Sequence, residues 1–309
     1  MSRGYILKFR FRKSEVDLRM YAQVFQYSIF IMINLLINQM NWKIDTLLLS
    51  KVISPLMDKS LMITVATNAQ LFSTVFSSMS IAISGFLLPK ATEMIVNKSS
   101  NAKITNLMIR VGRVQAMFLA LFLICFGTLG HSFVVLWVGK EYKDILIVAL
   151  IYMSSMFIPY IQHTGVVFLR AMNKHASRSI ALLVSSLLHV ALSVLLIPKY
   201  GVIGASIGTA FSFLIGDTVC VNVIYKKQGI EIRRFFRDTF AKLYIPILIT
   251  ILISLMTCLL PTNGWIMLVS KALVICCVYV VLLYFNGLNE EERMYLWRVV
   301  RRTLPNNSV

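Results

Sequence analysis

The sequence predicts an all-α, polytopic membrane protein: a helical bundle of about eight transmembrane helices. Three observations lead to this prediction. Of the 309 residues, 58% are hydrophobic and only 14% are charged, whereas soluble domains are roughly 45–50% apolar and about 25% charged. Apolar runs recur at about the 20-residue length that a membrane-spanning helix needs. Basic residues gather in alternate connections between these runs, which is typical of cytoplasmic loops.

The expected spans follow one another with short connections. They are residues 22–53, 61–88, 107–138, 145–169, 179–197, 202–225, 243–260 and 265–285. With a cytoplasmic N-terminus, 24 of the 31 lysines and arginines lie on the cytoplasmic side and six on the other, and Lys43 lies inside the first span. An odd number of spans would disrupt this alternation, so we expect both termini in the cytoplasm.

The spans divide the chain into five expected regions. They are a basic cytoplasmic segment (1–21), a six-helix bundle (22–225), a basic cytoplasmic loop (226–242), two additional spans (243–286) and a cytoplasmic tail (287–309). The net charge of +18 falls mainly in the short loops, so we expect anionic membrane lipids rather than nucleic acid as partners. The sequence has no metal-type cysteine spacing and no catalytic motif with supporting context. We therefore expect neither an enzyme nor a cofactor nor a metal site.

A polar stripe in the first span is the most informative pattern. Asn34, Asn38, Asn41 and Asp45 are spaced by four, three and four residues, which places them on one helical face. Polar groups in hydrocarbon are costly unless they are satisfied, so this face should meet protein or a water-filled cavity. Interhelical hydrogen bonding is one interpretation. A cavity wall that hydrates a polar substrate is the other, and Asp45 favours it because intramembrane carboxylates usually mark functional sites.

Other charged residues leave similar alternatives open. Arg113 and Arg170, at cytoplasmic helix ends, either reach lipid phosphate or face inward to bind an anion. Lys43 lies on a different face from Asp45 and either pairs elsewhere or reaches an internal anion. Asp217, inside the sixth span, must be neutral, paired across helices or hydrated, and with Asp45 it is a candidate for ion coupling.

His189 also lies within a span. We interpret it as a satisfied packing histidine rather than a proton carrier, because one histidine on such a face indicates little by itself.

Four short motifs carry a family resemblance. They are Ile44–Leu49 in the exit from the first span, Leu87–Thr92 (P-x-x-s), Leu136–Tyr142 (W-x-G-x-x-Y) and Ile197–Ala205 (iP-x-yG-i-GaA). In this order they resemble the O-antigen and capsule type of bacterial oligosaccharide flippase, in the superfamily of multidrug, oligosaccharidyl-lipid and polysaccharide exporters. The resemblance covers about residues 15–225. It implies one lobe, the C-terminal one, of a two-lobed flippase or extruder fold, with two extra helices.

The resemblance also implies a function. Such a flippase moves a polyprenyl-pyrophosphate-linked oligosaccharide across the bacterial plasma (inner) membrane for the assembly of lipopolysaccharide or capsule. It implies that Lys43, Arg113 and Arg170 attract the diphosphate and that the stripe from Asn34 to Asp45 contacts the sugars. A truncated or half-length member would need a separately encoded N-terminal lobe or a second copy. The alternatives are a cation-coupled multidrug extruder of the same superfamily, and an integral-membrane polysaccharide polymerase or glycosyltransferase.

Overall fold

The computed structural model describes residues 18–52, 57–290 and 292–294, and over these residues the chain is helical with no β-strand. The helices are α1 (Leu18–Val52), α2 (Lys59–Gly85), α3 (Leu88–Val96), α4 (Asn101–Trp137), the 3₁₀-helix η2 (Lys140–Tyr142), α5 (Asp144–Ile161), α6 (His163–Ala171), α7 (His175–Phe213), the π-helix η3 (Leu214–Cys220), α8 (Val221–Lys227), α9 (Ile232–Phe240), α10 (Tyr244–Cys258), α11 (Trp265–Leu282) and the π-helix η4 (Leu283–Gly287).

Several of these helices have the dimensions of membrane spans. In the described part of the chain, four segments are long and apolar enough to cross a bilayer: Asn101–Trp137, Lys140–Ile161, Ala176–Lys227 and Trp265–Gly287. The count rises to six if two bent pairs each form one span, α2 with α3 (bent by 43°) and α9 with α10 (bent by 51°). The prediction of an all-α helical bundle is therefore confirmed, and its apolar helices are those of a membrane protein.

The longest segment, Ala176–Lys227, is a helical hairpin rather than one rod. The backbone at Gly201 has φ 55° and ψ −131°, a conformation that glycine adopts far more readily than other residues. After this turn the chain runs back along itself, so that Ser185 and Ser212 exchange hydrogen bonds through their hydroxyls and carbonyls. We call residues 175–200 the first limb and residues 202–227 the second limb. The predicted spans 179–197 and 202–225 fall on separate limbs.

Two regions differ from the sequence-based expectation. The predicted span 145–169 is divided at Gln162 into α5 and α6. The expected loop at 226–242 contains the amphipathic helix α9, which buries Phe235 and Thr239 while Arg233 and Arg237 are exposed. Charge alone made this segment look like a loop, although its apolar residues recur at helical spacing.

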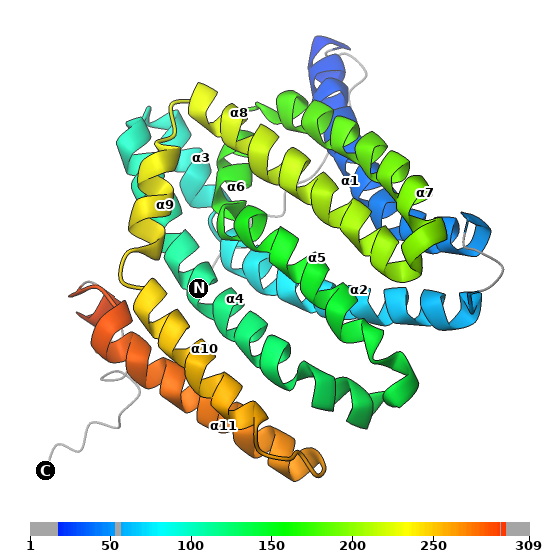
Figure 1. Ribbon diagram of the computed structural model, residues 1–309. Coiled ribbons are helices and arrows are strands. Elements are labelled where there is room, and N and C mark those ends of the chain that lie inside the picture. Colours follow the sequence, from blue (N-terminus) through cyan, green and yellow to red (C-terminus); the bar gives the residue numbers. More distant parts are fainter. Residues whose placement is uncertain (1–17, 53–56, 291, 295–309) are drawn as a thin grey trace, which may run out of the picture.

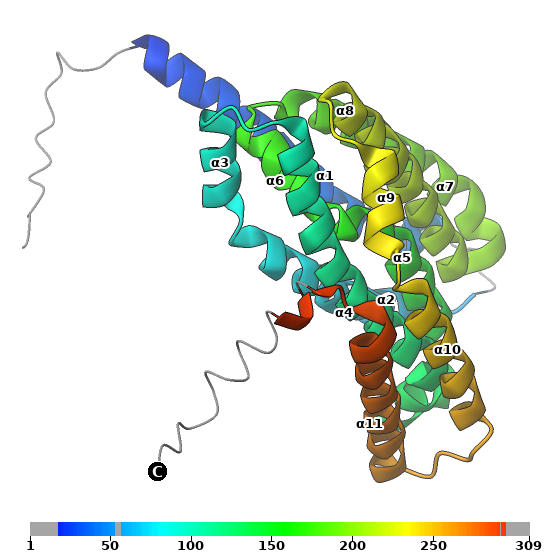
Figure 2. The same ribbon diagram turned by 90° about the vertical axis from the view of Figure 1, so that its left-hand side faces the viewer.

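The helices pack in a consistent order across the bundle. α1 packs chiefly on α7 and then on α2, α2 packs on α5, and α5 packs on α4. On its other side α4 contacts α9, α10 and α11, and Figure 1 shows α10 and α11 together along this flank. Figure 2, turned by 90°, shows α11 beside α10 at the opposite side of the molecule from the first turns of α1. Thus α4 separates the α1–α7 side from the α10–α11 pair.

Candidate functional site

The site begins with Asp45, the acidic end of the predicted stripe. Asp45 lies in the C-terminal half of α1 and is fully buried, as is Leu49 one turn later. Lys43 and Leu47 are exposed on the other side of the same helix. The carboxylate therefore faces the interior of the bundle, where an unpaired charge would be very costly.

Three side chains from neighbouring helices surround this carboxylate. Tyr152 of α5 donates its hydroxyl hydrogen to Asp45 Oδ2 at 3.0 Å, and Thr209 Oγ1 donates to the same oxygen at 2.7 Å. His189 Nε2 lies 2.7 Å from Asp45 Oδ1. Thr209 Oγ1 also lies 2.9 Å from His189 Nε2. We call Asp45, Tyr152, His189 and Thr209 the Asp45 cluster.

The cluster joins α1 to both limbs of α7 and to α5. His189 comes from the first limb and Thr209 from the second. All of its members are buried to 2% exposure or less. Both oxygens of the carboxylate have hydrogen-bond partners. Such partners are needed to offset the cost of removing a buried ionisable group from water. The cluster thus places a carboxylate and an imidazole in direct contact inside the bundle.

His189 is fully buried and hydrogen-bonded, which is consistent with the expected satisfied packing histidine. The sequence did not predict its partner, which is the Asp45 carboxylate. Ser185, which shares the helical face of His189, pairs with Ser212 of the second limb. The Ser185–Ser212 pairing follows from the hairpin turn at Gly201, which aligns the two limbs.

The remaining residues of the polar stripe fall partly outside the described structure. Asn34, Asn38 and Asn41 lie on α1, but their side chains are outside the described residues. Asp45 faces protein groups rather than an open cavity. The prediction that this stripe lines a cavity for sugars therefore stays a prediction.

Asp217 forms a second buried ion pair. Its Oδ1 lies 3.0 Å from Nη2 of Arg178, and both side chains are less than a fifth exposed. Asp217 lies in the π-helix η3, and π-turns within helices are frequent at functional sites. Of the three states that the sequence allowed, Asp217 is paired across helices. Its partner was not anticipated because Arg178 lies 39 residues earlier and was assigned to a cytoplasmic loop.

Arg113 is the most completely enclosed cation among the described residues, at 2% exposure. Its Nε and Nη2 bind the two carboxylate oxygens of Glu292 at 2.8 and 3.1 Å. Its Nη1 donates to the carbonyl oxygens of Asp238, Thr239 and Ala241, and Nη2 donates also to that of Gly287. Each nitrogen of the guanidinium therefore donates hydrogen bonds to protein oxygens.

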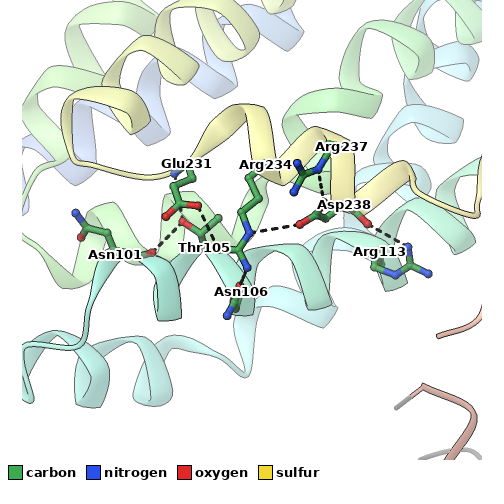
Figure 3. Close-up of polar contacts among 8 residues, drawn as sticks. All are labelled: Asn101, Thr105, Asn106, Arg113, Glu231, Arg234, Arg237 and Asp238. Atoms are coloured by element: carbon green, nitrogen blue, oxygen red, sulfur yellow. Dashed lines mark hydrogen bonds and ion pairs between the residues drawn. The ribbon is translucent and has the colours of Figure 1, made fainter. Parts of the chain in front are cut away.

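These contacts attach α9 and the segment after α11, namely the end of η4 and Glu292, to α4. Figure 3 shows α9 lying along α4, with Arg113 below the C-terminal end of α9. Nearer its N-terminal end, Arg234 Nη2 donates to Asn106 Oδ1 at 2.6 Å, and the backbone N–H of Glu231 donates to Thr105 Oγ1. In this arrangement a diphosphate could contact Arg113 only by displacing these partners, so its predicted substrate contact stays a prediction.

The other two predicted cations lie at the surface. Lys43 and Arg170 are both exposed, on α1 and at the end of α6. Neither belongs to the Asp45 cluster, so the structure does not gather the residues predicted to attract a diphosphate into one site. Among the described residues, no group of three or more His, Cys, Asp or Glu side chains could hold a metal ion.

Comparison with known proteins finds no match to this chain among family models, curated proteins or solved structures. The resemblance to oligosaccharide flippases consequently depends on the four sequence motifs.

Proposed function

We propose that this chain is one lobe of a membrane transporter of the oligosaccharide-flippase type, which moves a polyprenyl-pyrophosphate-linked oligosaccharide to the outer leaflet of the bacterial inner membrane. The observation that carries the proposal is the Asp45 cluster. An ionisable carboxylate enclosed by three helices of a membrane bundle is by default a functional residue. The four motifs supply the substrate class. We further propose eight spans with both termini cytoplasmic, counting the hairpin limbs separately.

The cluster suits a transporter that changes shape. Asp45 connects α1 with both hairpin limbs through short hydrogen bonds. A change in its protonation would alter these bonds and hence the packing of α1 on α7. Alternating access moves one helix body against another around the substrate site, and we propose that protonation of Asp45 is coupled to this movement.

A single six-helix unit needs an opposing wall to enclose a polar substrate. We propose that a second lobe supplies it, either a separately encoded N-terminal lobe or a second copy of this chain. The oligosaccharide and diphosphate could then cross between the lobes without entering hydrocarbon.

One observation favours a second candidate function. The pairing of Asp45 with His189 is suited to proton coupling, which a cation-coupled multidrug extruder of the same superfamily would also need. Such a transporter would confer resistance to organic cations and would not restore glycan export.

The test is export of surface glycan in a strain that lacks its own flippase, with the chain expressed together with a matching first lobe. Asp45→Asn keeps the size of the side chain but removes the ionisable group, and we expect loss of export at an unchanged protein level. Glu141→Gln, at an exposed acidic residue in η2, is the matched control and should keep export.

Thr209→Val and Tyr152→Phe, each removing one partner of Asp45, should give intermediate export if Asp45→Asn fails to accumulate. Wild-type export by all three variants would reject the proposal. Drug resistance without glycan export would favour the extruder.

A further inference from the structure

An apolar groove lies on the side of the bundle away from the Asp45 cluster. It has a volume of about 470 Å³ and is bounded by α4, α5, the end of α9 and α10. Its lining is made of aliphatic and aromatic side chains, among them Leu123, Phe157, Phe240 and Leu248. The volume is within the usual range of ligand pockets, about 300–1,000 Å³. Leu248 is 57% exposed, so the groove is open along the surface of α10.

The surroundings of the groove restrict what can fill it. α4 and α10 are apolar helices of a membrane bundle, so the open side of the groove meets lipid rather than water. The lining offers no charged side chain along its length. The part of an occupant that lies inside should therefore be a hydrocarbon chain.

A lysine lies close in the chain to two residues that line the groove. Lys242 lies in the turn between α9 and α10, two residues from each of the lining residues Phe240 and Tyr244. Lys242 is exposed and makes no hydrogen bond or ion pair with another described residue. Arg237, also exposed, is instead paired with Asp238 at 2.7 Å.

The backbone of this turn is held in an uncommon conformation. Lys242 has φ 66°, a left-handed value that residues other than glycine rarely adopt. Arg113 Nη1 binds the carbonyl oxygen of the preceding residue, Ala241, at 2.7 Å and so helps to fix the turn. A left-handed residue at this place commonly ends a helix, and here it directs the chain from α9 into α10.

We propose that this groove binds an anionic membrane phospholipid, with an acyl chain along α10 and the headgroup phosphate on Lys242. The apolar lining matches the acyl chain, and the ammonium of Lys242, which has no partner among the described residues, matches the single charge of a phosphodiester. This site is separate from the Asp45 cluster and does not depend on what the protein transports.

Native mass spectrometry of the purified full-length chain in detergent tests the proposal. Phosphatidylglycerol, phosphatidylcholine and a polyprenyl phosphate are titrated separately and in competition. We expect phosphatidylglycerol to bind about five-fold more tightly than phosphatidylcholine, because one nearby lysine attracts an anionic headgroup by about that factor. Lys242→Gln should abolish this preference, while Lys227→Gln, a matched exposed lysine at the end of α8, should keep it. Leu248→Trp, at the exposed rim, should weaken binding of both phospholipids.

Three outcomes would overturn the proposal. They are equal affinity of the wild-type chain for the two phospholipids, equal loss of preference in Lys227→Gln and Lys242→Gln, and displacement of phosphatidylglycerol by a lower concentration of polyprenyl phosphate. The last outcome would identify a polyprenyl carrier as the occupant.

Discussion

Replacing Arg113 with alanine removes the guanidinium that binds Glu292, the carbonyls at the end of α9 and the carbonyl of Gly287. Six hydrogen bonds are lost, and Glu292, whose side chain is only 17% exposed, is left without its counter-charge. Breaking a buried pair by removing one partner costs about 3–5 kcal/mol. At roughly 2–4 °C per kcal/mol for larger domains, the melting temperature should fall by about 10 °C.

The assay is thermal unfolding of the purified chain in detergent, with Arg110→Ala as the matched control. Arg110 lies three residues earlier on α4 and is exposed, so its replacement should cost no more than about 1 kcal/mol. Glu292→Gln should have an intermediate effect, because Arg113 keeps its carbonyl partners. Equal melting temperatures for Arg113→Ala and Arg110→Ala would refute the view that Arg113 attaches α9, η4 and Glu292 to α4.

Three further predictions follow from the same structure. Removing one hydrogen bond to the Asp45 carboxylate, as in Thr209→Val, should destabilise the chain by about 1.5–3 kcal/mol in denaturant unfolding; no change would mean that the carboxylate is not charged or not enclosed. Gly201→Ala should cost about 1–3 kcal/mol in the same assay because of its positive φ, whereas Gly85→Ala, with open space around its Cβ position, should not destabilise. For topology, an impermeant thiol reagent added outside should label single cysteines at positions 59, 140, 199 and 262 but not at 98, 174 and 228; the reverse pattern would contradict the proposed orientation.

The sequence predicted the helices better than their interruptions. Apolar length is a local property, so long spans such as 107–138 could be recognised directly. The division at Gln162 could not, because a bend within an apolar run leaves its hydropathy unchanged. α9 was missed for the opposite reason: its arginines suggested a loop, while Phe235 and Thr239 lie on a buried helical face.

The candidate site was predicted only in part. Asp45 could be recognised as a candidate because it lies deep within an apolar span. Carboxylates are rare there, since burying their charge in the membrane costs free energy. His189, the partner of Asp45, lies 144 residues away, and helical phase cannot say which neighbouring helix a face will meet. The same limit applies to Arg178, whose pairing with Asp217 depends on the alignment of the two limbs by the hairpin turn.

The turn at Gly201 sets the alignment of the two limbs that together bind Asp45. His189 binds Asp45 from the first limb and Thr209 binds it from the second limb. His189 Nε2 and Thr209 Oγ1 also lie 2.9 Å apart. If one limb moved past the other by a helical turn, the shift would be about 5.4 Å, far beyond the range of these bonds. Asp45 would then lose one of its two hairpin partners, so the contact of α1 with the hairpin depends on the alignment of the two limbs.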